Sequence, residues 1–179
     1  MACVSGGYCG GDDTCKGCTQ DEGEPAACST NDSPTCGAGW KSVATEKDQW
    51  LILNEGSPFP SVDVDFFVVT LTDTEFLAFL DPTVEFTNES GVPLEVCVWW
   101  KNASGEAATL TNGCTDGDAA GSYDLGWEGA PGCCRIAASM TGVQKVGFAV
   151  TDAPGQALVR VRPSAGLGSC GKYTMQVHL

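Results

Sequence analysis

Eleven cysteines in 179 residues constrain this chain more than any other feature of its sequence. In a reducing compartment so many thiols need metal-binding or catalytic roles, whereas in an oxidising one they need only pair as disulfides. The single histidine, His178, argues against a large set of zinc sites. The cysteines therefore predict a secreted or cell-surface protein. Because eleven is odd, one cysteine is expected to be free, modified or bonded to another chain.

The first part of the chain is rich in cysteine and poor in large apolar side chains. Between Met1 and Trp40 only Val4 and Tyr8 are large and apolar, so this segment buries too little area to offset its chain entropy. We predict a loop-like, disulfide-stapled segment over residues 1–41 and a separate domain over residues 42–179. The segment holds Cys3, Cys9, Cys15, Cys18, Cys28 and Cys36, and the domain holds Cys97, Cys114, Cys133, Cys134 and Cys170.

The pairing of these cysteines is open at the level of sequence. Three bonds in the segment, with two bonds and one left-over cysteine in the domain, are our preferred partition, and a cross-link between the two parts is the alternative. Cys133 and Cys134 are adjacent and point to opposite sides of the chain, so we expect them to bond to different partners. Cys15 and Cys18, joined by Cys28 and Cys36, offer a zinc site as an alternative to disulfides.

From residue 40 onward, short apolar runs alternate with clusters of Gly, Asn, Asp and Pro. In 94–101, Leu94 and every second residue after it are apolar, while Glu95 and every second residue after that share the other face. The run 66–69 is apolar on both faces and predicts a fully buried strand. Strands are expected at 50–53, 62–72, 83–88, 94–101, 133–139, 144–151, 157–163 and 172–179, with turns at "NESG", "NASG" and "TNGC" (111–114). This spacing, without a sustained helical period, predicts an all-β antiparallel sandwich.

Several fragments occur in an order that resembles the bacterial pre-peptidase C-terminal (PPC-like) domain family, in its Cys-containing secreted variety. They are "DVDFFVVTL" (63–71), "DPTVEF" (81–86), "PLEVCVWW" (93–100), "GCC" (132–134), "ALVRVRP" (157–163) and "CGKYTMQVHL" (170–179). The resemblance implies a jelly-roll-like sandwich of about eight strands, a bacterial extracellular setting and a non-catalytic role beside enzymes or adhesive modules. Some relatives bind calcium, collagen or polysaccharide.

Charge and motifs exclude several classes of function. The formal net charge of −14 repels nucleic acid and anionic membrane surfaces. An apolar run of about 18 residues is missing, so no transmembrane segment is expected. No G-x-S-x-G motif occurs, and His178 faces outward beside the C-terminus. We therefore predict no enzymatic activity.

Acidic pairs supply the candidate metal ligands, with calcium as the ion expected. Asp63 and Asp65 lie two residues apart on one face at the start of a strand, and Asp116 and Asp118 lie in a Gly-Asp loop. Carboxylate oxygens so placed suit calcium. The alternative is that they are solvated strand ends.

Trp99 and Trp100 are the candidate ligand-binding aromatics. As neighbours on a strand they point to opposite faces, so one belongs to the core. The other is either a platform for stacking a sugar ring or is covered by a loop.

Together these features predict a secreted, non-catalytic binding or accessory module that engages a surface glycan or protein. The alternative is a structural subunit of an extracellular assembly or filament, in which the arm of residues 1–41 reaches a neighbouring copy.

Overall fold

The chain is all-β in the part that the computed structural model describes. That part comprises residues 8–9, 15–16, 43–45, 50–56, 64–71, 82–89, 93–102, 104, 110–121, 127–138, 141–150, 155–164 and 173–178, and contains no helix. The strands are β1 (Tyr8–Cys9), β2 (Cys15–Lys16), β3 (Val43–Thr45), β4 (Trp50–Gly56), β5 (Asp65–Leu71), β6 (Thr83–Asn88), β7 (Leu94–Asn102), β8 (Leu110–Asp116), β9 (Asp118–Ala120), β10 (Gly132–Ala137), β11 (Thr141–Val150), β12 (Gly155–Pro163) and β13 (Tyr173–His178).

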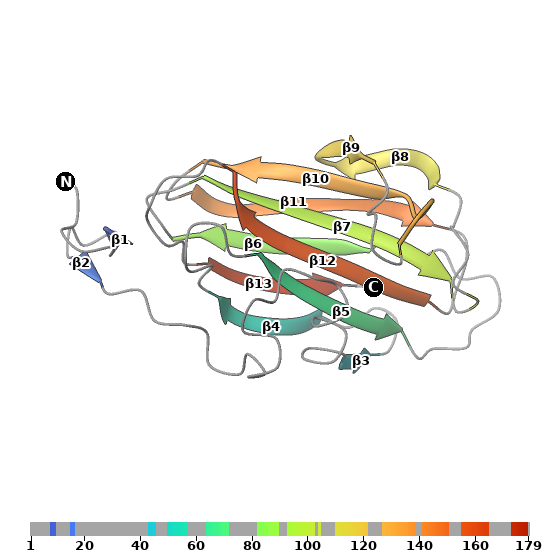
Figure 1. The fold of residues 1–179 in the computed structure, drawn as a ribbon, viewed down its shortest axis with the longest axis horizontal. Helices are drawn as coiled ribbons and strands as arrows, with labels where there is room; N and C mark the ends of the chain where they lie inside the picture. The colour runs from blue at the N-terminus through green and yellow to red at the C-terminus, as the bar shows by residue number, and fades with distance from the viewer. Residues whose placement is uncertain are drawn as a thin grey trace.

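Two sheets form the sandwich (Figure 1). The six-stranded sheet has the order β3-β5-β12-β7-β10-β9, and the five-stranded sheet has the order β4-β13-β6-β11-β8. Neighbouring strands are antiparallel except β3 and β5, which are parallel. The two short strands of the N-terminal segment pair with each other, and Cys9 is the register partner of Cys15.

The strand order is that of a jelly roll. Consecutive strands from β4 to β8 alternate between the two sheets, and the later strands return along the earlier ones, so that β5 pairs with β12, β6 with β11 and β7 with β10. The predicted antiparallel sandwich is therefore confirmed. The sheets hold more than the expected eight strands, in part because β3 and β9 add three residues each at sheet edges.

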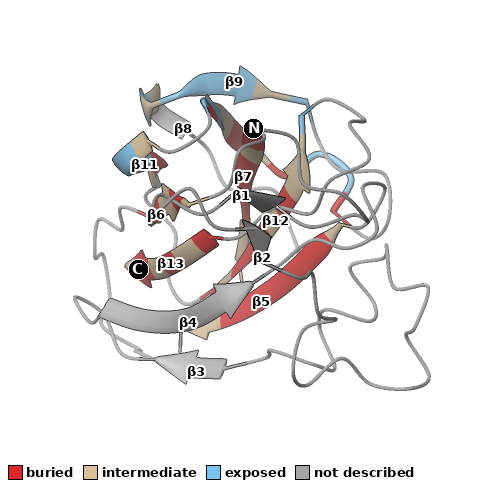
Figure 2. Ribbon diagram, turned by 90° about the vertical axis from the view of Figure 1, so that its left-hand side faces the viewer, coloured by how far each residue is buried: buried red, intermediate tan, exposed pale blue. Residues whose placement is uncertain are grey.

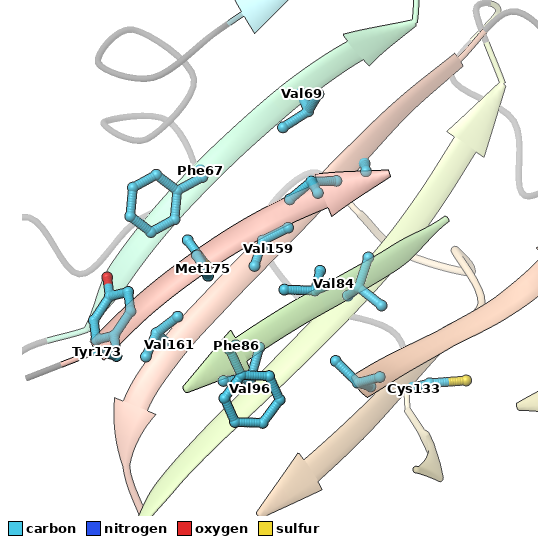
Figure 3. Packing of buried hydrophobic residues seen from close by; sticks show 14 of the residues in the cluster. Phe67, Val69, Val84, Phe86, Val96, Cys133, Val159, Val161, Tyr173 and Met175 are labelled. Carbon is cyan, nitrogen blue, oxygen red and sulfur yellow. The ribbon is translucent and has the colours of Figure 1, made fainter. Parts of the chain in front are cut away.

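The core lies between the two inner sheet faces and is built by alternation along the strands. In β13, Tyr173, Met175 and Val177 are buried while the residues between them are only partly buried. Figure 3 shows Tyr173 and Met175 beside Phe67, Val159 and Val161 of the facing sheet. The alternation fills one continuous apolar layer, because side chains two residues apart share a face.

Strand β5 is buried on both faces, as predicted. Phe66, Phe67, Val68 and Val69 are each at most 3% exposed. Phe67 and Val69 belong to the inner core, whereas Phe66 and Val68 belong to a second cluster on the outer side of the six-stranded sheet. The six-stranded sheet is therefore packed on both sides over β5, β12 and β7.

The prediction of a turn at 111–114 is wrong, because these residues lie inside β8. Gly113 has a φ of 75°, and the β8–β11 register shifts between the pairs Phe148–Cys114 and Val150–Leu110. A glycine with positive φ marks both turns and irregular strands, so sequence alone did not separate the two. The reversal comes later, at Gly117, whose φ is 86°.

Candidate functional site

The outer face of the six-stranded sheet carries a second apolar layer, called here the covered face. Its buried members are Phe66, Val68, Cys97, Trp99, Trp127, Ala130 and Leu158. Trp127 and Ala130 come from the segment before β10, where the Pro131 carbonyl oxygen accepts a hydrogen bond from the backbone N–H of Trp100. In Figure 2 the central strands β5, β7 and β12 are largely buried while β9 is exposed. Burial on both sides explains why β7 carries large side chains at successive positions.

Trp99 is fixed within this layer. Its indole Nε1 donates a hydrogen bond to the Gly121 carbonyl oxygen at 2.8 Å, and a Cβ built on Gly132, its register partner, would lie 2.2 Å from Trp99 Cδ1. Trp100 points the other way, into the core between the sheets. Their exposed fractions are 2% and 0%. Neither ring therefore presents a face on which a sugar could stack, and the loop cover considered as an alternative is the arrangement observed.

A cluster of charges lies beside Trp99. The Glu95 carboxylate pairs with the guanidinium groups of Arg160 and Arg162, and the Arg162 Nη2–Glu95 Oε2 distance is 2.9 Å. Arg160 also lies over the Trp99 ring, 5.0 Å from its centroid. Burial acting alone would raise the pKa of Glu95, but the hydrogen bond and charge of Arg162 and the charge of Arg160 outweigh it and hold that pKa below its ordinary value.

Two disulfides leave the adjacent cysteines of β10 in different directions. Cys134 bonds to Cys97, its register partner on β7, on the covered face. Cys133 bonds to Cys114 of β8 and joins the six-stranded sheet to the five-stranded one. The prediction that the adjacent pair has different partners is confirmed. Cys3, Cys18, Cys28, Cys36 and Cys170 lie outside the described residues, and of Cys9 and Cys15 only the backbone is described.

Three groups of a possible metal site meet at the Cys97–Cys134 bond. Ligand atoms of Glu95, Cys97 and Cys134 lie within 4.8 Å of one another. The two sulfurs share a covalent bond and carry no thiolate, and two arginines hold the carboxylate, so the oxidised cluster does not suit a cation. The sequence had placed Glu95 and Cys97 on one face but gave no sign of Cys134 or Arg160 beside them.

The calcium candidates are not brought together. Asp65 is 1% exposed and accepts a 2.7 Å hydrogen bond from the Tyr173 hydroxyl, so it is an interior group rather than a solvated strand end. Asp63 lies outside the described residues. Asp116 has Arg135 Nη1 at 4.0 Å, and Asp118 is exposed beyond the bend at Gly117. The cation beside Asp116 opposes a second cation there.

The outer face of the five-stranded sheet is polar and is called here the open face. It carries Thr83, Glu85, Thr87, Lys145, Thr174, Gln176 and His178, none of them buried. Glu85 lies in a row across three strands: Lys145 Nζ is 2.7 Å from Glu85 Oε1, and Gln176 Nε2 donates to Glu85 Oε2 at 2.6 Å. The hydrogen bonds from Lys145 and Gln176 lower the pKa of Glu85, and the hydrogen bond to Glu85 raises that of Lys145.

Comparisons with known proteins add little. No family model matches the sequence, and no curated protein does. A solved structure of the surface-associated copper-binding protein CorA of Methylomicrobium album BG8 is 11% identical, covers 78% of this chain and 98% of its own, and has a TM-score of 0.31. A TM-score this low does not establish a shared fold, and copper binding is not carried over. Within the described residues, no helix is long and apolar enough to cross a membrane.

Proposed function

We propose that the protein is a secreted, non-catalytic binding or accessory module that engages a surface glycan through the open face. The observation that carries the proposal is the row formed by Lys145, Glu85 and Gln176 across β11, β6 and β13. The row presents a cation, a carboxylate and an amide in fixed positions, flanked by threonine hydroxyls. Donors and acceptors so mixed match the hydroxyl groups of a sugar chain, which both donate and accept hydrogen bonds.

Three further observations support this function. The covered face already buries its aromatic residues, which leaves the open face as the accessible sheet surface. Disulfides on both sides of β10 fit an oxidising, extracellular setting. The resemblance to the PPC-like family remains a prediction, and it points to the same class of module.

The proposal also holds that the chain has no catalysis of its own. Three carboxylates in the described part of the two sheets are paired with cations: Glu85 with Lys145, Glu95 with two arginines and Asp116 with Arg135. Such pairs stabilise the charged form, so these three carboxylates are poorly placed to act as bases in proton transfer. Substrate profiling should find no turnover, and a turnover abolished by one Ser or Asp substitution would refute this part.

A glycan array followed by calorimetry on the best hit tests the binding face. Gln176→Ala on the open face should weaken binding at least several-fold. Gln156→Ala is the matched control, because Gln156 bonds to Thr70 Oγ1 on the six-stranded sheet. Equal losses in the two variants would refute the open face as the binding surface, and a protein hit without any glycan hit would change the ligand class.

The alternative function, a structural subunit of an extracellular assembly, is favoured by two exposed apolar side chains. Ile136 of β10 and Val143 of β11 are 61% and 63% exposed. Large exposed aliphatic groups suit contacts with other copies. Light scattering on the protein with and without reductant decides between the two functions. A stable oligomer that is lost in the Ile136→Thr variant would favour the structural subunit over the binding module.

A further inference from the structure

We propose that the Cys97–Cys134 disulfide is a thiol-exchange site, at which an external thiol forms a mixed disulfide with Cys134 and releases Cys97. The proposal rests on the surroundings of the two sulfurs and is independent of glycan binding. Its substrate class is a small-molecule or protein thiol.

The two cysteines differ in access. Cys97 is fully buried beneath the covered face, at 0% exposure, whereas Cys134 is partly exposed on β10. β10 is the last long strand on its side of the sheet, flanked there by the three-residue strand β9. Exchange requires an attacking thiolate to reach one sulfur in line with the bond, so attack falls on Cys134.

The two cysteines also differ in the charge that surrounds them. Arg160 Nη2 lies 3.3 Å from Cys97 Sγ. The guanidinium is fixed there by its contact with Trp99 and by its ion pair with Glu95, and the Arg160 side chain is only 13% exposed. A positive charge at this distance stabilises a thiolate, and a stabilised thiolate is a faster leaving group.

Glu95 acts in the opposite direction, since its Oε1 also lies 3.3 Å from Cys97 Sγ. Its charge is shared between two guanidinium groups, those of Arg160 and Arg162. The nearby cations therefore outweigh the carboxylate at the sulfur, and the leaving group gains net stabilisation.

The step balances without an oxidant. The thiolate of the external thiol attacks Cys134 Sγ and forms a new sulfur–sulfur bond, while the Cys97–Cys134 bond breaks and its electron pair leaves on Cys97. The proton lost by the attacking thiol is matched by the proton that the Cys97 thiolate can take up. One disulfide is consumed and one is formed, so the exchange involves no net oxidation.

The second disulfide provides an internal control. Cys133 is fully buried in the apolar core between the sheets, where a leaving thiolate would be desolvated among apolar side chains. Its partner Cys114 has its sulfur 3.9 Å from the Gly132 carbonyl oxygen, whose partial negative charge also disfavours a thiolate. Cys114–Cys133 should therefore resist exchange under conditions in which Cys97–Cys134 reacts.

The experiment uses the full chain, folded, with glutathione as the thiol. Limited exposure, alkylation of released thiols and peptide mass spectrometry should place glutathione on Cys134 and the alkyl group on Cys97, with Cys114–Cys133 intact. Glutathione on Cys97, prior reaction of Cys114–Cys133, joint reaction of both bonds, or no reaction of either would each overturn the proposal.

Two substitutions in the same cluster should have different effects on the rate. Arg160→Gln should slow release of Cys97 by roughly tenfold, since the leaving thiolate loses its cation. Glu95→Gln should leave the rate unchanged or raise it, because it removes the opposing carboxylate. Arg135→Gln is the matched control, as Arg135 bonds to the Lys145 carbonyl oxygen rather than to the disulfide. If Arg160→Gln and Glu95→Gln slowed the exchange equally, or if Arg160→Gln had no effect on its rate, the arginine would have a structural role only.

Unfolding of a variant can be distinguished from a change in the rate of thiol exchange. If Arg160→Gln unfolded the protein, Cys114–Cys133 would become reactive together with Cys97–Cys134. Arg160→Lys keeps the cation near the sulfur and should retain part of the rate. A rate for Arg160→Lys no higher than for Arg160→Gln would contradict the electrostatic argument.

Discussion

The two sheets of the sandwich turn different surfaces outward. The covered face packs Trp99, Trp127 and Leu158 into an apolar layer, whereas the open face carries threonines and the polar row around Glu85. Both faces are built from strands that alternate inward and outward side chains with the same period. The difference lies in the outward side chains: those of the covered face pack with Trp127 and Ala130 into a buried cluster, whereas those of the open face are partly buried or exposed.

The comparison teaches that similar ion pairs differ in what they do. Glu95 has two arginine partners on one neighbouring strand, β12, whereas Glu85 has one partner on each of its neighbours, β11 and β13. Glu95 belongs to a cluster packed against an indole and a disulfide, so it supports packing. Glu85 belongs to a surface row, where water and salt weaken its pairing.

The largest expected effect comes from truncating Trp99. Trp99→Ala removes a buried indole from the covered face and should lower the free energy of unfolding by about 3–5 kcal/mol. Thr174→Ala on the open face should change it by about 0.5 kcal/mol or less. Chemical denaturation of both variants measures the difference, and equal effects would mean that the covered face is not a packed layer.

Filling the space beside Trp99 is the next test. Gly132→Ala would place its Cβ 2.2 Å from Trp99 Cδ1 and 2.4 Å from Nε1, so the indole must move. We expect a loss of about 1–3 kcal/mol. Gly142→Ala, at a position on β11 with nothing within 4 Å of a new Cβ, is the control and should be close to neutral. A larger loss of stability in Gly142→Ala than in Gly132→Ala would contradict the packing described for the covered face.

Acid titration distinguishes the buried cluster from the surface row. The pKa of Glu95 is below its ordinary value of 4.5, so its contribution is present above that pH and is lost as pH falls through the folded-state pKa. Glu95→Gln should cost about 1–3 kcal/mol at neutral pH and flatten the loss of stability in acid.

Glu85→Gln is the comparison for that titration. The pKa of Glu85 is lowered too, so the sign of its pH dependence is the same, but its partner Lys145 is half exposed. The loss at neutral pH should be smaller than for Glu95→Gln. A larger loss at Glu85 would reverse the assignment of packing and surface roles.

Salt dependence gives the smallest expected effect. Lys145→Gln should lower the Tm slightly at low ionic strength and leave it unchanged in concentrated salt, because exposed charges are screened. Arg160→Gln, on a side chain that is only 13% exposed, should keep its effect in salt. Thermal melts across a salt series would contradict the comparison if both variants responded alike.

Much of the fold could be predicted because the alternation of apolar and polar side chains along a strand is a local property of the sequence. Leu94, Val96 and Val98 face inward and Glu95, Cys97 and Trp99 face outward on β7, as their spacing indicated. The double-sided burial of β5 also followed from its continuous apolar run. That Gly113 lies inside a strand could not be predicted, because a glycine with positive φ occurs in irregular strands as well as in turns.

The candidate site followed from the sequence only in fragments. That Cys133 and Cys134 have different partners could be inferred from their adjacency, but Cys97 and Cys114 as those partners could not. Asp65 was predicted as a calcium ligand, with a solvated strand end as the alternative, yet it is buried and accepts a hydrogen bond from Tyr173, 108 positions away in the sequence. The sequence left open whether the outward-facing tryptophan is a sugar platform or is covered. Trp99 is buried, and its indole bonds to the carbonyl oxygen of Gly121, 22 positions away.

The sequence by itself determined an oxidised, acidic, all-β protein and the face of each side chain on several of its strands, because these depend on composition and on the two-residue period of an extended backbone. Only the tertiary structure decided which faces meet. Glu95 pairs with Arg160, 65 residues away in the sequence, and Cys97 is bonded to Cys134, 37 residues away. Both contacts form because β7 lies between β12 and β10 in the jelly-roll order. Register between distant strands is fixed by the packing of the whole sandwich, since a slip of one residue would turn every buried side chain of a strand to the wrong face.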